Sequence, residues 1–254
     1  MMARLLAVAG VLVIALLLPF PAFAQEAGGG EITLFNLNDT DNGQTLSVKL
    51  QILVLMTLLG LVPAMLMLMT CFTRFIIVLA ILRQAMGLQQ SPPNNVMIGI
   101  ALALTLLVMR PVWQEIHQNA YEPFQNDTIS LEQGLDVAKK SMAGFMLAQT
   151  NKNALDTILD LAKEEAPANL EELDFTLLLP AFVLSELKTA FQLGFMIFVP
   201  FLVIDLVVAS VLMAMGMMML SPMMISLPFK LMVFVLVDGW TLLVGTLTTS
   251  IQPF

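Results

Sequence analysis

Two long apolar blocks with a polar segment between them dominate the hydrophobic pattern of this chain. The first block opens with Leu46–Met69, which is long enough to cross a bilayer as one helix. Pro63 falls inside this run and is expected to kink it, because proline removes a backbone donor and crowds the preceding turn. The pattern therefore predicts that the block begins with a long, kinked apolar helix.

A connection and a second apolar run complete the first block. The connection carries Arg74 and Arg83 and ends in residues 89–95, where prolines and asparagines stop a helix. The run that comes next, Val96–Met109, has fourteen residues, which is short for a free-standing membrane span. We predict an apolar helical hairpin over residues 46–111.

The polar segment, residues 112–179, has the pattern of soluble amphipathic helices. Ser130 and Gln133 stand three residues apart, as in a capping box at the start of a helix. The apolar positions after them fall on one helical face: Leu131, Leu135, Ala138, Met142, Phe145 and Met146. The acidic residues near the end of the segment fit a solvated face or, alternatively, an acidic docking or gating surface: Glu164, Glu165, Glu171, Glu172 and Asp174.

The second apolar block, residues 180–254, contains charges that a simple membrane span does not tolerate. Charged side chains inside apolar segments are costly and normally face a protein interior or a watery pathway. Broken helices at membrane depth are tolerated only where protein buries them or where they line a cavity. We predict a C-terminal apolar helical hairpin, interrupted by Pro200, Pro222 and Pro228, with these charges inside it: Glu186, Lys188, Asp205, Lys230 and Asp238.

Seven methionines fall within residues 213–224 of this hairpin. Methionine is flexible and polarizable, so such a cluster can mould itself around shapes that change. Composition alone favours ordinary lipid-facing or core packing over an adaptable surface.

The N-terminus has the pattern of a targeting segment. Arg4 precedes the apolar run Leu5–Leu18, and Ala22-Phe23-Ala24 is a small-x-small cleavage pattern. We predict a cleaved signal peptide over residues 1–24, cut between Ala24 and Gln25, with an uncleaved anchor helix as the alternative. Residues 25–45 are then a flexible polar lead-in. This topology leaves the two arginines of the connection inside and the polar segment on the periplasmic side, in agreement with the positive-inside rule.

Composition narrows the class of protein. The chain of 254 residues is 58% hydrophobic and only 12% charged, with a mean hydropathy of +0.88. A soluble monomer of this size cannot hide so much apolar surface, which excludes an ordinary cytosolic enzyme, a nucleic-acid binder and a disordered chain. Residues 115–188 hold thirteen acidic and five basic side chains and so account for the whole net charge of −8.

Candidate chemistry is sparse. Cys71 and His117 are the only cysteine and histidine, so they cannot form a four-ligand zinc site of the Cys/His type. The sequence shows no Ser/His/Asp set, phosphate-binding loop or metal cluster. We predict that the protein is not an enzyme and uses no cofactor or metal.

Long strings in both blocks resemble one family. Residues 180–195 read PAFVLSELKTAFQLGF, and they are followed by PFLVID at 200–205, VVASVLMAMGM at 207–217, SLPFKLM at 226–232 and VDGW at 237–240. Together with QQSPPN at 89–94, these strings are similar to the FliP family, and the resemblance runs from about Leu46 onward. Leu193 is a conservative departure from the family pattern, and the lead-in and insert match only loosely.

The resemblance implies a fold and a function. FliP-family proteins form the main subunit of the export gate of the flagellar type III secretion apparatus, in the bacterial inner membrane within the basal body. It implies an all-α, membrane-associated fold of bent and broken helical hairpins that assemble side by side into an oligomeric helical cone. The implied partners are further copies of the chain, five in all, the companion subunits FliQ and FliR, other export-apparatus and basal-body ring proteins, and the unfolded rod, hook and filament proteins that pass through.

The resemblance also assigns roles to residues. Met217, Met218 and Met219 correspond to a methionine gasket that closes the pore, where a hydrophobic constriction blocks ions by dewetting. The charges of the second block are implied to pair structurally between helices or subunits, because an unpaired buried charge is strongly destabilising. These are Glu186, Lys188, Asp205, Lys230 and Asp238.

Three other interpretations stay open. The first is the equivalent subunit of a virulence injectisome, against which the signal peptide argues. The second is a proton-coupled small-solute transporter with Asp205 and Asp238 as carriers, although the two blocks show no internal repeat. The third is an intramembrane aspartyl protease, which lacks support because Asp238 stands in Val-Asp-Gly-Trp and not in a Gly-x-Gly-Asp string.

Overall fold

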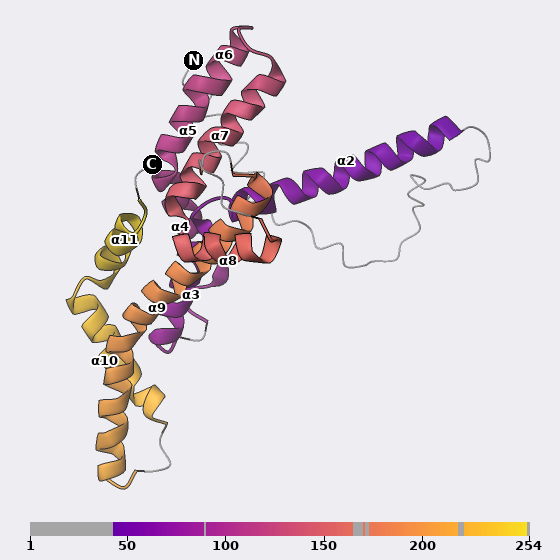
Figure 1. Ribbon diagram of the computed structural model, residues 1–254. Helices are drawn as coiled ribbons and strands as arrows, with labels where there is room; N and C mark the ends of the chain where they lie inside the picture. Colours follow the sequence, from indigo (N-terminus) through magenta and orange to yellow (C-terminus); the bar gives the residue numbers. More distant parts are fainter. Residues whose placement is uncertain (1–42, 89, 165–169, 171–172, 218–220, 253–254) are drawn as a thin grey trace, which may run out of the picture. The chain divides into compact units, whose positions relative to one another are not determined.

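The computed structural model describes residues 43–88, 90–164, 170, 173–217 and 221–252, and within them all regular structure is helical (Figure 1). The prediction of an all-α fold is confirmed for this part of the chain. The predicted signal peptide, its cleavage position at Ala24–Gln25 and most of the lead-in lie outside the described residues. The chain divides into two units, residues 1–52 and 53–254, and the second of these holds the packed core.

The part of the first apolar block before residue 89 contains two helices where the sequence predicts one helix and a connection. Helix α2, Gly43–Leu68, runs through Pro63, and helix α3, Phe72–Ala85, follows it. Residues 52–68 and 72–85 make an angle of 68°. The interpretation of Arg74 and Arg83 as parts of a non-helical connection is therefore wrong. Both arginines belong to α3, in which they flank a mostly apolar run that favours a buried helix.

The second run of that block is also half of a bent pair. Helix α4 spans Asn94–Val108, and the chain then turns by 54° into α5, Arg110–Ile116. A π-helical turn, His117–Tyr121, links α5 to α6, Glu122–Gln125. The apolar run at 96–109 is short because the chain remains helical beyond the bend, in α5, where the sequence is more polar.

The predicted capping box at the start of α7 is confirmed. Helix α7 spans Leu131–Gln149; the Gln133 N–H donates to Ser130 Oγ at 3.3 Å, and the Ser130 N–H donates to Gln133 Oε1 at 3.0 Å. The predicted apolar face is buried only in its second half, at Met142, Phe145 and Met146, whereas its first two leucines are exposed. Helix α8, Lys152–Ala162, follows and is capped by Asn151.

The second apolar block is built on one long helix. Helix α9, Phe175–Ala214, contains two prolines without interruption and is capped by Asp174, whose Oδ1 accepts the Thr176 N–H at 3.0 Å. Helix α10, Pro222–Leu236, and helix α11, Gly239–Thr249, follow and are bent by 66° to one another. The predicted breaks at Pro200 and Pro228 are absent, because these prolines lie inside α9 and α10, and only Pro222 stands at a helix boundary.

Helices α3 and α9 form the centre of the packed unit, and in Figure 1 they lie side by side. Phe75, Val78 and Leu82 of α3 are buried in the same core cluster as Phe182 and Ala190 of α9. Each fully buried Phe, Leu or Val side chain contributes about 1.5–3 kcal/mol relative to an exposed one. Gly194 permits the close approach, because a Cβ at this position would lie 2.3 Å from Ile81 Cδ1.

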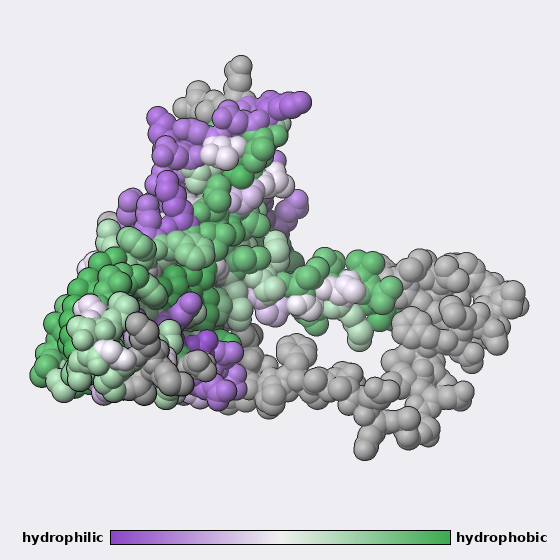
Figure 2. Space-filling model, turned by 90° about the horizontal axis from the view of Figure 1, so that it is seen from below, coloured by the Kyte–Doolittle hydropathy of each residue, from purple (hydrophilic) through white to green (hydrophobic). Residues whose placement is uncertain are grey.

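Much apolar surface remains uncovered. Side chains of α2, α9 and α10 are largely exposed, for example Leu59 at 71%, Met196 at 71% and Leu236 at 78%. Figure 2 shows a broad hydrophobic area on the face that it presents. In the described part of the chain, α9 alone is long and apolar enough to cross a membrane, and counting each bent pair as one span raises the number to four. Such a surface requires lipid or other subunits to cover it.

Candidate functional site

The methionine-rich segment connects α9 and α10. Helix α9 ends in a Schellman motif, in which the Met217 N–H donates to Leu212 O and the Gly216 N–H donates to Met213 O, both at 3.0 Å. Gly216 has φ +74°, a left-handed conformation that favours glycine. Pro222 then opens α10, where its missing N–H costs no helical hydrogen bond. The local sequence thus determines where α9 ends and where α10 begins.

Only part of the expected gasket lies within the described residues. Met217 directly follows the Gly216 turn and is 39% exposed, while Met218 and Met219 lie outside the described residues. Beside the segment, α9 and α10 enclose a wholly apolar groove of about 580 Å³, lined among others by Val207, Met215 and Phe229. The arrangement presents thioether side chains at the tip of a helical hairpin.

A buried ionic network braces this hairpin. Lys230 Nζ of α10 donates to Asp205 Oδ2 of α9 at 2.6 Å and to the Ala85 carbonyl, at the end of α3, at 3.0 Å. Ser226 Oγ donates to Asp205 Oδ1 at 2.5 Å. The Lys230 side chain is 2% exposed and that of Asp205 is 33% exposed, so the network is sealed on one side and open on the other.

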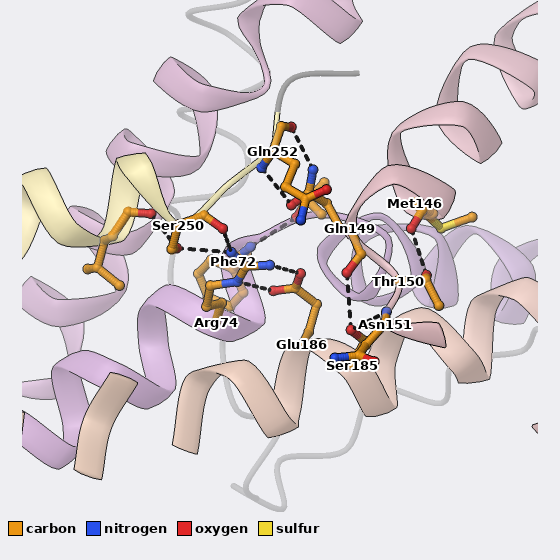
Figure 3. A network of polar contacts seen from close by, with 12 residues as sticks. Phe72, Arg74, Met146, Gln149, Thr150, Asn151, Ser185, Glu186, Ser250 and Gln252 are labelled. Atoms are coloured by element: carbon orange, nitrogen blue, oxygen red, sulfur yellow. Dashed lines mark hydrogen bonds and ion pairs between the residues drawn. The ribbon is translucent and has the colours of Figure 1, made fainter. Parts of the chain in front are cut away.

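A second network is buried more deeply (Figure 3). Arg74 Nε and Nη2 donate to Glu186 Oε2 and Oε1 at 2.8 and 2.5 Å, which is a two-point ion pair between α3 and α9. The two side chains are 2% and 1% exposed. Arg74 Nη1 also donates to the carbonyl and hydroxyl oxygens of Ser250, at 2.8 and 3.0 Å.

Neutral groups extend this second network to the end of α7. Gln149 Nε2 donates to the Gln252 carbonyl at 2.7 Å, and the Gln252 N–H donates to Gln149 Oε1 at 3.1 Å. Ser185 Oγ donates to the Gln149 carbonyl at 3.1 Å and accepts the Asn151 N–H at 2.9 Å. Figure 3 shows these groups converging from helices far apart in the sequence.

The five charged residues predicted to pair in the second apolar block differ in their surroundings. Glu186, Asp205 and Lys230 each have an oppositely charged partner within the chain. Lys188 and Asp238 are exposed, and in the described residues neither makes an ion pair. Asp238 instead occupies a left-handed position, φ +50°, immediately before α11. Two of the five charges are therefore presented at the surface of the chain.

Sequence reasoning missed Arg74 and Gln149. Arg74 lies among apolar residues just as the acids of the second block do, and the same cost of burying a charge could have identified it. Gln149 carries no comparable signal, because a lone glutamine at the end of an amphipathic helix is usually solvated. Its role depends on the path of residues 250–252, which no local pattern specifies.

The described part of the chain shows no cluster of side chains that could bind a metal ion. No group of three or more histidine, cysteine, aspartate or glutamate side chains there is arranged to hold a metal ion. His117 is half-exposed and contacts the Glu122 carboxylate at 3.4 Å. The buried polar groups are arranged for pairing between helices.

Comparison with known proteins gives a consistent result. A sequence model of the FliP family matches residues 55–247. The chain is 48% identical over 219 residues to the flagellar biosynthetic protein FliP of Bacillus subtilis, covering 86% of this chain and 98% of the relative. It is 52% identical over 210 residues to the protein of the same name from Pectobacterium carotovorum, covering 83% and 81%. With that of Caulobacter vibrioides it shares 45% identity over 237 residues, covering 93% and 86%.

Proposed function

The chain belongs to the FliP family, and from that membership we propose that it is a core subunit of the flagellar type III protein export gate. In this role it forms part of the channel through which unfolded rod, hook and filament proteins cross the inner membrane during flagellum assembly. The observation that carries the proposal is the family match, because it extends over the methionine-rich segment and over Arg74, Glu186, Asp205 and Lys230.

The geometry of the hairpin suits a seal that yields to a peptide. Helices α9 and α10 are held in register by the Asp205–Lys230 pair, while the segment between them carries flexible thioethers. In a ring of copies, Met217, Met218 and Met219 would form a narrow apolar gasket that blocks ions by dewetting. An extended peptide would displace these side chains without moving the helices behind them.

Assembly with other subunits accounts for the uncovered apolar surface. We propose five copies of the chain, together with FliQ and FliR, arranged as a helical cone within the basal body and contacting its other export-apparatus and ring proteins. Packing of helices from neighbouring subunits would bury the apolar faces of α2, α9 and α10. The exposed charges Lys188 and Asp238 are then available for contacts between subunits.

The targeting segment indicates how the chain is oriented in the inner membrane. We propose that residues 1–24 are removed as a signal peptide and that the acidic insert, residues 112–179, lies on the periplasmic side of the inner membrane. Energy for export comes from other components, and this subunit is a passive gate with no enzymatic activity, cofactor or nucleic-acid ligand.

The rival functions are not favoured. The FliP relatives from Bacillus, Pectobacterium and Caulobacter are flagellar proteins by name, which argues against the injectisome branch. Asp205 is engaged by Lys230 and Ser226, which suits a structural brace better than a proton carrier or a catalytic acid. Asp238 is an exposed residue at the start of a helix.

Export by a strain lacking this gene tests the proposal. Filament protein would be assayed separately in cells and in the medium, with and without a restoring copy of the gene. We expect the extracellular fraction to disappear on deletion and to return on complementation. Normal secretion and motility in the deletion strain would reject the flagellar assignment.

A further inference from the structure

Residues Ser250–Gln252, which follow α11, are held by side chains from two other helices. Arg74 of α3 binds the Ser250 carbonyl and hydroxyl, and Gln149 of α7 binds both the N–H and the C=O of Gln252. Ile251 between them is partly buried against the core. This three-residue segment, which we call the strap, therefore connects α11 to α3 and α7.

Arg74 needs the strap to satisfy its donors. A guanidinium has five N–H donors in a fixed fork, and two of its three nitrogens are directed at Glu186. Nη1 is directed at the two oxygens of Ser250. Because Arg74 is buried, water cannot replace these acceptors without opening the core. Displacing the strap would leave a buried charged group with unpaired donors.

The Gln149 side chain binds the backbone of Gln252 and not its side chain. Its amide oxygen accepts from one backbone group of Gln252 and its amide nitrogen donates to the other, as a neighbouring β-strand would. Gln149 is itself buried, and its own carbonyl accepts from Ser185 Oγ, one residue before Glu186. The side chain of residue 252 takes no part in either bond, so any residue with an N–H fits.

We propose that the strap, bound at Gln252 through its backbone alone, is a lock that couples α11 to the buried Arg74–Glu186 pair and to the end of the insert helix α7. The strap and the ion pair are then one cooperative unit, since release of residues 250–252 removes acceptors from Arg74. Any movement of α11 relative to α7 must first break this lock. The inference rests on contacts within one chain and is independent of the proposed export function.

A matched pair of substitutions tests the lock in the full-length protein, purified in detergent. Gln252→Ala keeps the backbone N–H, whereas Gln252→Pro removes it. Gln149→Ala removes both bonds between Gln149 and the backbone of residue 252, without changing the strap. Thermal unfolding would be measured for each variant, and amide hydrogen exchange at residue 252 for the wild type, Gln252→Ala and Gln149→Ala.

Backbone recognition gives a definite pattern of results. We expect Gln252→Ala to behave as the wild type, with a protected amide at residue 252. Gln149→Ala should accelerate that exchange on the order of tenfold, as for loss of one hydrogen bond. Gln149→Ala and Gln252→Pro should each lower the unfolding temperature, and the double variant should be no worse than the more damaging single one, because the one bond that Gln252→Pro removes is already absent in Gln149→Ala.

Three results would overturn the proposal. The first is free exchange of the residue 252 amide in the wild type. The second is a Gln149→Ala protein that is folded and exchanges as slowly as the wild type. The third is equal damage from Gln252→Ala and Gln252→Pro, which would assign the role to the side chain.

Discussion

Arg74 and Glu186, 112 residues apart in the chain, form a two-point ion pair in which neither side chain is more than 2% exposed. The pair joins α3 of the first apolar block to α9 of the second. A buried pair of this kind stabilises little relative to apolar residues of the same shape, but it strongly disfavours any arrangement in which one partner is missing. It therefore specifies how the two blocks pack.

Removal of one partner of this pair should be more harmful than removal of both. We expect Arg74→Met or Glu186→Leu to cost about 3–5 kcal/mol of stability, because the remaining charge is buried and unpaired. The double variant should recover part of that loss. Unfolding in detergent measures these differences, with Lys188→Met as an exposed control on the same helix as Glu186. Additive losses in the double variant would contradict the pairing.

The Asp205–Lys230 pair should matter for assembly. In Asp205→Ala the Lys230 ammonium keeps only the Ala85 carbonyl as an acceptor, so the α9–α10 hairpin loses its brace. We expect loss of the assembled complex on native gels, with partial recovery in Asp205→Ala/Lys230→Met. Normal complexes with abolished export would instead indicate a direct role for Asp205 in transport.

Gly194 should be intolerant of a single added methyl group. In Gly194→Ala the new Cβ would meet Ile81 Cδ1 at 2.3 Å, where α9 packs against α3. We expect a cost of about 1–3 kcal/mol from overpacking. Gly144→Ala in α7 is the matched control, because, apart from its chain neighbours and the backbone of its own helix, no atom lies within 4 Å of its added Cβ. Ile81→Val removes the clashing atom and should partly restore Gly194→Ala; no restoration would contradict the steric explanation.

Asp174 should make the start of α9 sensitive to acid. The backbone N–H of Thr176, followed by its hydroxyl, lowers the pKa of Asp174 below its usual value. A depressed folded-state pKa stabilises the folded protein above the unfolded pKa, and this contribution is lost as the pH falls through the folded one. We expect amide hydrogen exchange at the first turn of α9 to accelerate as the pH falls through the folded-state pKa of Asp174. The acceleration should exceed the intrinsic pH dependence of amide exchange. Asp174→Asn should cap the helix without this acid response, and an unchanged response would contradict the assignment.

The hydrophobic pattern predicts the apolar blocks and the helical insert because each feature is local. The capping box at Ser130 and the end of α9 at Gly216 depend on a few adjacent residues, and both can be read from the sequence. The helical state of residues 72–85 is missed because the arginines there resemble a positive loop. The apolar neighbours of Arg74 indicate burial, but the groups that bind it, the Glu186 carboxylate and the Ser250 carbonyl, are distant in sequence, so no local pattern identifies its partners.

In the candidate site, too, the sequence predicts some features and not others. The charges Glu186, Asp205 and Lys230 are conspicuous because apolar residues surround them, and the structure gives each of them a partner. Which charge pairs with which depends on the crossing of α3, α9 and α10, and hydropathy contains no information on that crossing. Lys188 lies only two residues from Glu186 yet is exposed, because successive positions of a helix face different directions.

Ion conductance of membranes that contain the assembled gate tests the central claim most directly. Replacement of Met217, Met218 and Met219 together by alanine should leave assembly intact but let ions leak during export, because alanine cannot fill the constriction. The matched control replaces the exposed methionines Met65, Met196 and Met232, which lie outside the segment, and should stay tight. A properly assembled Met217–Met219 variant with wild-type conductance would contradict the account.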